Sequence, residues 1–224
     1  MAASVTGAGY DDAAQRRIPG YSSLARLAIS LVAGFPSLAA AGAPLLVVGC
    51  GTGAELSEAR RQRPDWMLTA VDPAAEMVAE AKARLAQAAS AVSWIEGPAQ
   101  SVPGESCFGG AIAVLVLQEL ADDGSKLDFL AALARLLQPG APLVLVDLMG
   151  GGSGLNSAIE QQFQEALLRF QRSSELPLPG VDEVPLHPIG EARRSALLAA
   201  AGFSDPIRFY QALGVEGVLV QRRQ

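Results

Sequence analysis

The chain lacks the features that several classes of protein require. Its two cysteines, Cys50 and Cys107, cannot form a disulfide framework and are too few for a zinc site. A formal net charge of −6 disfavours a protein that grips nucleic acid, because such proteins present a basic surface. There is no apolar run of about 20 residues to span a bilayer, and residues 1–9 do not resemble a secretory signal.

We therefore expect a cytoplasmic protein with free thiols and no metal site, which binds neither nucleic acid directly nor a membrane. The sequence carries no sign of an oligomeric state. What it does contain is a regular alternation of apolar runs and amphipathic segments. Strands are predicted at 45–48, 66–72, 92–95, 111–117 and 142–147, and helices at 22–35, 54–62, 74–87 and 125–137. This alternation is typical of a doubly wound, mainly parallel α/β sheet.

The regular pattern ends after Asp147. A glycine-rich segment leads into a predicted helix over 156–172, and a proline-rich stretch follows from Pro177 to Pro188. We interpret 151–188 as a helical lid inserted into a domain over 44–224, with an N-terminal helical cap over 1–43. Beyond a helix at 191–201, two short strands at 207–213 and 217–221 predict an antiparallel hairpin around Gly214 at the edge of the sheet.

The first apolar run ends in three glycines at alternate positions, Gly49, Gly51 and Gly53, followed by residues that readily start a helix. Because glycine has no Cβ, this turn can adopt positive φ and let a ligand lie against the backbone. The pattern fits a dinucleotide such as NAD, with Ala54 in the last position and Asp72 reaching a ribose hydroxyl. It fits S-adenosylmethionine equally well.

Other features separate these ligands. A short-chain NAD oxidoreductase needs a tyrosine with a lysine four residues on, and no tyrosine meets this condition: Tyr10, Tyr21 and Tyr210 are followed there by Ala14, Ala25 and Gly214. The Gly-Lys-Ser/Thr of a phosphate-binding loop is also absent. Short-chain NAD chemistry is therefore unsupported.

Five motifs occur in a characteristic order along the chain. They are Val47 to Gly53, Ala70-Val71-Asp72-Pro73 followed by Met77, Glu96 to Ala99 leading to Pro103, Pro139-Gly140, and Ala201-Gly202-Phe203. Together they resemble class I S-adenosylmethionine-dependent methyltransferases. The resemblance implies a Rossmann-like, seven-stranded, mainly parallel sheet with an antiparallel C-terminal strand, and S-adenosylhomocysteine as product. The residues that it places at the cofactor are Gly49, Cys50, Gly51, Gly53, Asp72, Pro73, Met77, Pro98, Ala99, Gln100, Val114 and Gln118.

A narrower resemblance involves Arg17 to Ser22, Val116 to Leu120 and Phe209-Tyr210-Gln211. These segments are similar to the branch containing carboxy-S-adenosylmethionine synthase, which prepares a carboxylated cofactor for tRNA wobble-uridine modification. The tyrosine of its Pro-Gly-Tyr-Ser motif contacts the cofactor, which implies the same for Tyr21.

The chain departs from that branch at three positions. Pro98 stands for an acidic residue, Val114 for an asparagine, and Leu197 for the arginine that would pair with the extra carboxylate. Arg193 or Arg194 could supply that charge instead. We therefore expect ordinary S-adenosylmethionine as the cofactor. The alternatives are an enzyme that makes a carboxylated cofactor and a non-catalytic protein that binds S-adenosylmethionine.

We expect in-line methyl transfer to a small-molecule or peptide acceptor, chiefly through positioning. Two residues are candidate general bases. Glu119 follows the fourth strand at the edge where ligands bind in α/β sheets, although a solvated glutamate at a helix start reads the same way. His187 is the only histidine and lies between prolines in the expected lid, where an exposed loop histidine is the alternative. The acceptor itself is not indicated.

Overall fold

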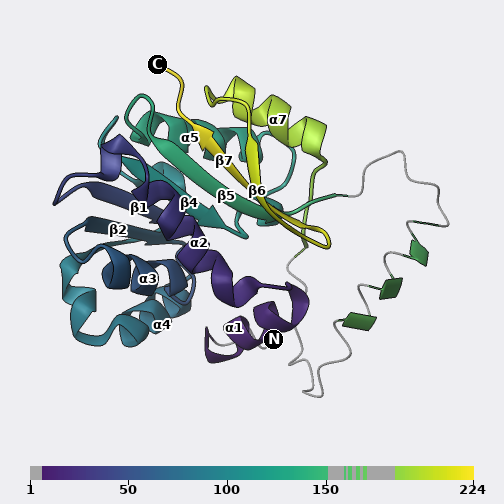
Figure 1. Cartoon of the computed structure of the whole chain (residues 1–224), viewed down its shortest axis with the longest axis horizontal. Helices are drawn as coiled ribbons and strands as arrows, with labels where there is room; N and C mark the ends of the chain where they lie inside the picture. The colour runs from purple at the N-terminus through teal and green to yellow at the C-terminus, as the bar shows by residue number, and fades with distance from the viewer. Residues whose placement is uncertain (1–6, 151–158, 160, 163–164, 167–168, 171–184) are drawn as a thin grey trace.

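The protein is built on one seven-stranded sheet, seen in a computed structural model that describes residues 7–150, 159, 161–162, 165–166, 169–170 and 185–224 (Figure 1). Its strand order is β3-β2-β1-β4-β5-β7-β6. The neighbouring pairs among the first five strands are parallel, and β7 runs antiparallel to both β5 and β6. The strands are β1 (Pro44–Val48), β2 (Met67–Asp72), β3 (Val92–Glu96), β4 (Gly110–Val114), β5 (Pro142–Leu148), β6 (Ile207–Ala212) and β7 (Val215–Gln221). This is the expected Rossmann-like fold.

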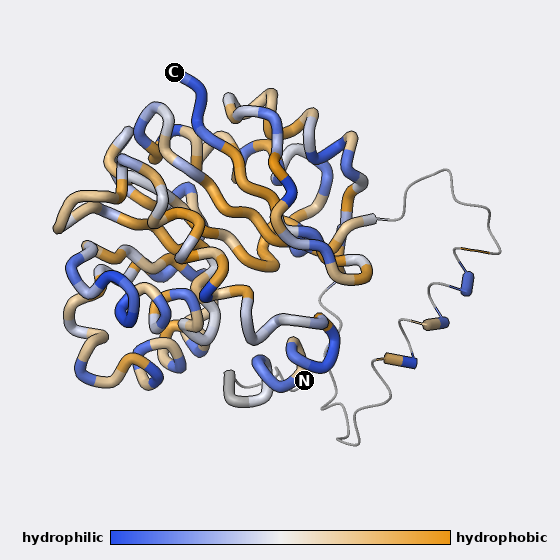
Figure 2. Tube along the Cα trace, viewed as in Figure 1, coloured by the Kyte–Doolittle hydropathy of each residue, from blue (hydrophilic) through white to orange (hydrophobic). Residues whose placement is uncertain are grey.

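Helices cover both faces of the sheet. Successive side chains of β1 point to opposite faces, so Val47 packs with α2 and α3 residues in one core cluster while Leu46 packs with α5 and α7 residues in the other. Because both faces are covered, the inner strands are apolar at nearly every position, and they form the hydrophobic centre in Figure 2. The helices are α1 (Gly7–Arg17), α2 (Tyr21–Ala33), α3 (Ala54–Gln62), α4 (Ala75–Leu85), α5 (Ser125–Leu136) and α7 (Glu191–Ala200). None in the described part of the chain is long and apolar enough to cross a bilayer.

One sequence prediction needs correction. The apolar run over 111–117 is not one strand, because Leu115 adopts a left-handed φ of 62° that ends β4 at Val114. The predicted C-terminal hairpin is confirmed: β7 pairs with β5, and β6 is the edge strand on that side of the sheet. Helix α1 was not individually predicted. The predicted helix over 156–172 and most of the proline-rich stretch lie largely outside the described residues.

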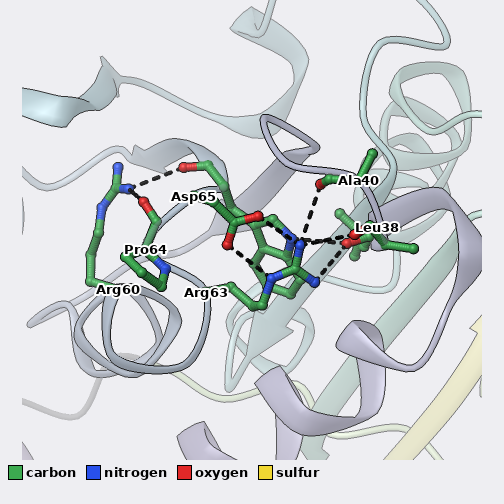
Figure 3. A network of polar contacts seen from close by, with 8 residues as sticks. Leu38, Ala40, Arg60, Arg63, Pro64 and Asp65 are labelled. Atoms are coloured by element: carbon green, nitrogen blue, oxygen red, sulfur yellow. Dashed lines mark hydrogen bonds and ion pairs between the residues drawn. The ribbon is translucent and has the colours of Figure 1, made fainter.

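A polar network closes the sheet at the amino ends of β1 and β2 (Figure 3). The Arg63 guanidinium donates to the carbonyl of Leu38 at 3.0 Å and to Asp65 at 2.8 Å. It also lies 4.8 Å from the ring centroid of Trp66, whose indole N–H donates to the same Leu38 carbonyl at 2.9 Å. This amino edge is thus held by paired polar groups around a buried indole.

Candidate cofactor site

The glycine turn after β1 has the predicted backbone. Gly49, Gly51 and Gly53 have φ of 62°, 47° and 82°, which disfavour any side chain. A Cβ on Gly49 would lie 2.3 Å from the Val116 side chain, whereas at Gly51 the nearest atom would be 4.0 Å away. Close packing against Val116 therefore requires glycine at position 49. At Gly51 no side chain covers the backbone, so a ligand can lie against it.

Cys50 lies inside this turn and is almost fully buried. Its backbone N–H donates to Val71 at the end of β2 over 3.1 Å. Burial raises the pKa of its thiol to about 12, so the thiol stays protonated at neutral pH. The side chain is therefore a packing group, and only its backbone faces the turn.

The Asp72 carboxylate joins three elements at the carboxyl edge of the sheet. One oxygen accepts the Gly51 N–H at 2.8 Å, and the other accepts the Ala74 N–H at 2.9 Å, just before α4. Only 6% of the residue is exposed. The carboxylate is thus fixed in orientation beside the uncovered turn, where it can accept hydrogen bonds from a bound nucleoside.

The loop after β3 lies against this carboxylate residue. The Gly97 N–H donates to the Asp72 carbonyl at 3.0 Å, and a Cβ on Gly97 would lie 2.8 Å from the Ser101 hydroxyl oxygen. In the same loop Ala99 is buried, while Pro98 and Gln100 are exposed. The ends of β1, β2 and β3 therefore converge. Near them, Pro73 is exposed and Met77 half-buried at the start of α4.

Gln118, which the resemblance places at the cofactor, lies just after β4 in the short helix Leu117–Glu119. Its side-chain oxygen accepts the Leu148 N–H at 2.8 Å, and its own N–H donates to Asp147 at 3.1 Å. Its side chain is thus bonded to β5, whereas Val114 is half-buried at the strand end.

Asp147, which the sequence analysis did not single out, is buried at the end of β5. One of its carboxylate oxygens has no hydrogen-bond partner among the described residues. Burial raises its pKa to about 7, which hydrogen bonds from Gln118 and Leu117 and the charge of Lys126 only partly oppose. Its position at a strand end was the one sequence signal that could have identified it.

The N-terminal helices reach the same edge. Asp11 of α1 accepts a hydrogen bond from the Thr52 hydroxyl of the glycine turn at 2.8 Å and forms an ion pair with Arg84 of α4. Tyr21, at the start of α2, is half-buried beside these groups, and burial followed by Tyr10 and Glu55 raises the pKa of its phenol. The structure thus brings Tyr21 toward the predicted cofactor residues.

Neither candidate base is fixed by a side-chain contact among the described residues. Glu119 is exposed at the carboxyl edge, and partial desolvation together with the nearby Asp72 raises its pKa. His187 is also exposed; its backbone N–H donates to the Gln118 carbonyl at 2.6 Å, which places residues 185–189 beside the end of β4. Both residues therefore lie at the correct edge.

The two arginines considered as partners for an extra carboxylate are already paired. Arg193 binds Asp122 at 2.9 Å on the surface, and Arg194, only 2% exposed, binds Glu216 at 2.9 Å. Leu197 is packed in the core. None of these three positions offers a free cation.

Comparison with known proteins agrees with this geometry. Residues 45–140 match the family model of a methyltransferase domain, a segment that contains the glycine turn, Asp72 and the Gly97 loop. This match agrees with the expectation of an S-adenosylmethionine-dependent methyltransferase. None of the proteins with curated functions matches the sequence.

Several solved structures share the fold of this chain. One is the putative methyltransferase in complex with the Haloferax volcanii Trm112 methyltransferase activator, at 14% identity and a TM-score of 0.68, covering 100% of both chains. The 1,6-didemethyltoxoflavin-N1-methyltransferase of Burkholderia thailandensis is 20% identical with a TM-score of 0.60, over 89% of this chain and 78% of that chain.

The mitomycin 7-O-methyltransferase MmcR is 18% identical with a TM-score of 0.62, over 91% of this chain and 55% of that chain. The protein therefore spans only about half the length of MmcR. At these identities the likeness concerns the fold.

Proposed function

We propose that the protein transfers the methyl group of S-adenosylmethionine to a small-molecule acceptor at the carboxyl edge of the sheet. The observation that carries this proposal is the contact between Gly51 and Asp72, which sets a buried carboxylate beside an uncovered glycine backbone. The toxoflavin and mitomycin methyltransferases, named for small-molecule substrates, support this acceptor class over a peptide.

The proposed roles follow from the position of each group. The uncovered backbone at Gly51 and the Asp72 carboxylate would hold the nucleoside, and the loop over 97–101 would border its base. S-adenosylmethionine supplies an electrophilic methyl group on a sulfonium, which becomes a neutral thioether when the methyl carbon bonds to the acceptor. Glu119, exposed at the same edge with a raised pKa, is the candidate that would accept the acceptor's proton.

Calorimetry with S-adenosylhomocysteine tests the cofactor assignment. Asp72→Asn keeps the size of the side chain but removes its charge, and we expect an affinity loss of at least about tenfold, equivalent to about 1.4 kcal/mol. Asp65→Asn at the amino edge is the matched control and should bind like the wild type. Failure of the wild type to bind would refute the proposal.

The carboxylated cofactor is the second possibility from the sequence, and neither Arg193 nor Arg194 supports it, because both are paired. Mass spectrometry of the ligand retained through purification distinguishes the two, because an added carboxylate changes the ligand's mass. A cofactor that binds without turnover of any acceptor would instead favour a non-catalytic binding protein.

A further inference from the structure

A small cavity lies where the N-terminal helices meet the start of α3. Its volume is about 170 Å³, which is enough for a small polar group. Asp11 of α1, Tyr21 of α2, Glu55 of α3 and Arg84 of α4 line it. Glu55 comes two residues after Gly53, so this cavity adjoins the glycine turn on the side of α3.

The charges around this cavity do not balance. Arg84 is paired with Asp11, whose other oxygen accepts the Thr52 hydroxyl. Glu55, 9% exposed, has no such partner: its carboxylate is hydrogen-bonded only to its own backbone N–H within the described part of the chain. Burial raises its pKa to about 7, even though it sits at a helix N-terminus and near Arg84. One buried carboxylate is therefore left without a cation.

The turn separates this carboxylate from Asp72. Burial raises the pKa of the Tyr10 phenol, and four nearby carboxylates add to the rise: Glu119, Glu55, Asp11 and Asp72. Tyr10 therefore lies near carboxylates on both sides of the glycine turn. A cofactor whose ribose is bound by Asp72 must extend its amino-acid end away from that residue. The cavity at Glu55 lies beside the turn and is lined by polar side chains.

We infer that Glu55 binds the α-ammonium group of the methionyl end of S-adenosylmethionine. This inference rests on the proposed function and assigns a residue to the far end of the same ligand. An ammonium group supplies the missing positive charge and donates hydrogen bonds to the buried carboxylate. The phenol of Tyr21, a hydrogen-bond donor in the same cavity, suits the neighbouring α-carboxylate.

The pairing makes cofactor binding depend on pH in a defined direction. A proton on Glu55 competes with the ammonium group, so affinity should fall as the pH drops below about 7, by up to about tenfold per pH unit. The phenols of Tyr10 and Tyr21 stay neutral in this range, and Asp11 is paired with Arg84, so Glu55 governs the change among the groups that face the cavity.

5′-Methylthioadenosine provides the discriminating probe, because it has the nucleoside and thioether but no amino-acid end. We would titrate it and S-adenosylhomocysteine into the wild type, Glu55→Gln and the control Asp65→Asn across about pH 6 to 8. Glu55→Gln should weaken S-adenosylhomocysteine by about tenfold or more, leave methylthioadenosine within about twofold, and remove the pH slope. Glu55→Asp should retain the slope.

The outcomes separate the two claims. If neither ligand binds the wild type, the proposed function fails. If both bind but Glu55→Gln leaves the ratio of their affinities unchanged, the function stands and the role of Glu55 is refuted. If Glu55→Gln does not fold, titrations of the wild type alone are sufficient. A ratio of the affinities for S-adenosylhomocysteine and methylthioadenosine that does not change with pH would contradict the inference.

Discussion

The two edges of the sheet use polar groups in opposite ways. At the amino edge, Arg63 is bonded to carbonyl groups and to Asp65 around the indole of Trp66 (Figure 3). At the carboxyl edge, Glu55 and Asp147 are buried with their pKa values raised to about 7. A buried carboxyl group whose desolvation is only partly offset by nearby cations and hydrogen bonds reduces stability, and such groups concentrate at functional sites. The polar groups of the amino edge therefore stabilise the fold, whereas those of the carboxyl edge destabilise the ligand-free protein and are suited to binding a ligand.

The largest effect should come from the amino edge. Trp66→Ala removes an indole that is 1% exposed, together with its hydrogen bond to Leu38, and should lower the free energy of unfolding by about 3–5 kcal/mol. Urea denaturation measures the loss. Met67→Ala is the adjacent control, because Met67 is 64% exposed and its truncation should change stability by less than about 0.5 kcal/mol. Equal losses in both variants would contradict the contrast between the edges.

Glycine substitutions compare the two edges directly. Gly49→Ala combines a φ of 62° with a 2.3 Å approach to Val116, and should destabilise the fold by about 2–4 kcal/mol and impair cofactor binding. Gly42, before β1, has a φ of 76° but open space around it, so Gly42→Ala should cost only about 1–2 kcal/mol and leave binding intact. Thermal unfolding and calorimetry report both quantities, and similar behaviour of the two variants would show that the close approach does not matter.

The raised pKa of Glu55 predicts how stability changes with pH. Between its ordinary pKa of 4.5 and the folded value of about 7, the folded state keeps a proton that the unfolded chain releases, so the ligand-free protein loses stability as pH rises. Glu55→Gln abolishes this loss and should exceed the wild type by up to about 3 kcal/mol at pH above 7, with the advantage shrinking toward pH 5. An advantage that does not vary with pH, in denaturation curves across this window, would rule out a buried ionisable Glu55.

The smallest stability effects should come from the two ion pairs Asp11–Arg84 and Asp65–Arg63. Both are partly exposed, so Asp11→Asn and Asp65→Asn should each change stability by less than about 1 kcal/mol. Only Asp11→Asn loosens α1 from the glycine turn, so only it should speed dissociation of S-adenosylhomocysteine, by up to roughly tenfold. Stopped-flow displacement measures these rates, and equal rates would deny Asp11 a role in retaining the cofactor.

Local pattern was sufficient to predict most of the fold. The helix over 54–62 was predicted with its observed bounds, because the glycine turn fixes its start and its apolar residues repeat at helical spacing. The strand predicted over 111–117 was too long, since an apolar run does not reveal that Leu115 turns to positive φ. Burial on both sides explains the apolar composition of the run. The end of the strand at Val114 depends on tertiary packing, where the Leu115 N–H donates to the Val146 carbonyl of β5.

The site was predictable only where its residues belong to one local motif. Asp72 is the last residue of β2, and its contact with Gly51 confirms that the two lie together. A local motif could not predict the role of Asp11, because its partners Thr52 and Arg84 are 41 and 73 residues away in the sequence. Glu55 stood beside the motif in the sequence, but its significance comes from burial and missing charge, which only the assembled helices create.

The position of β7 has a consequence for biosynthesis. This strand is made after the other six, yet it pairs with both β5 and β6 in the finished sheet. Until Val215 to Gln221 have left the ribosome, the hydrogen-bonding edge of β5 stays open, and open edges of this kind promote association between chains. A chain interrupted before β7 should therefore aggregate even though the strands that carry the glycine turn and Asp72 have all been synthesised.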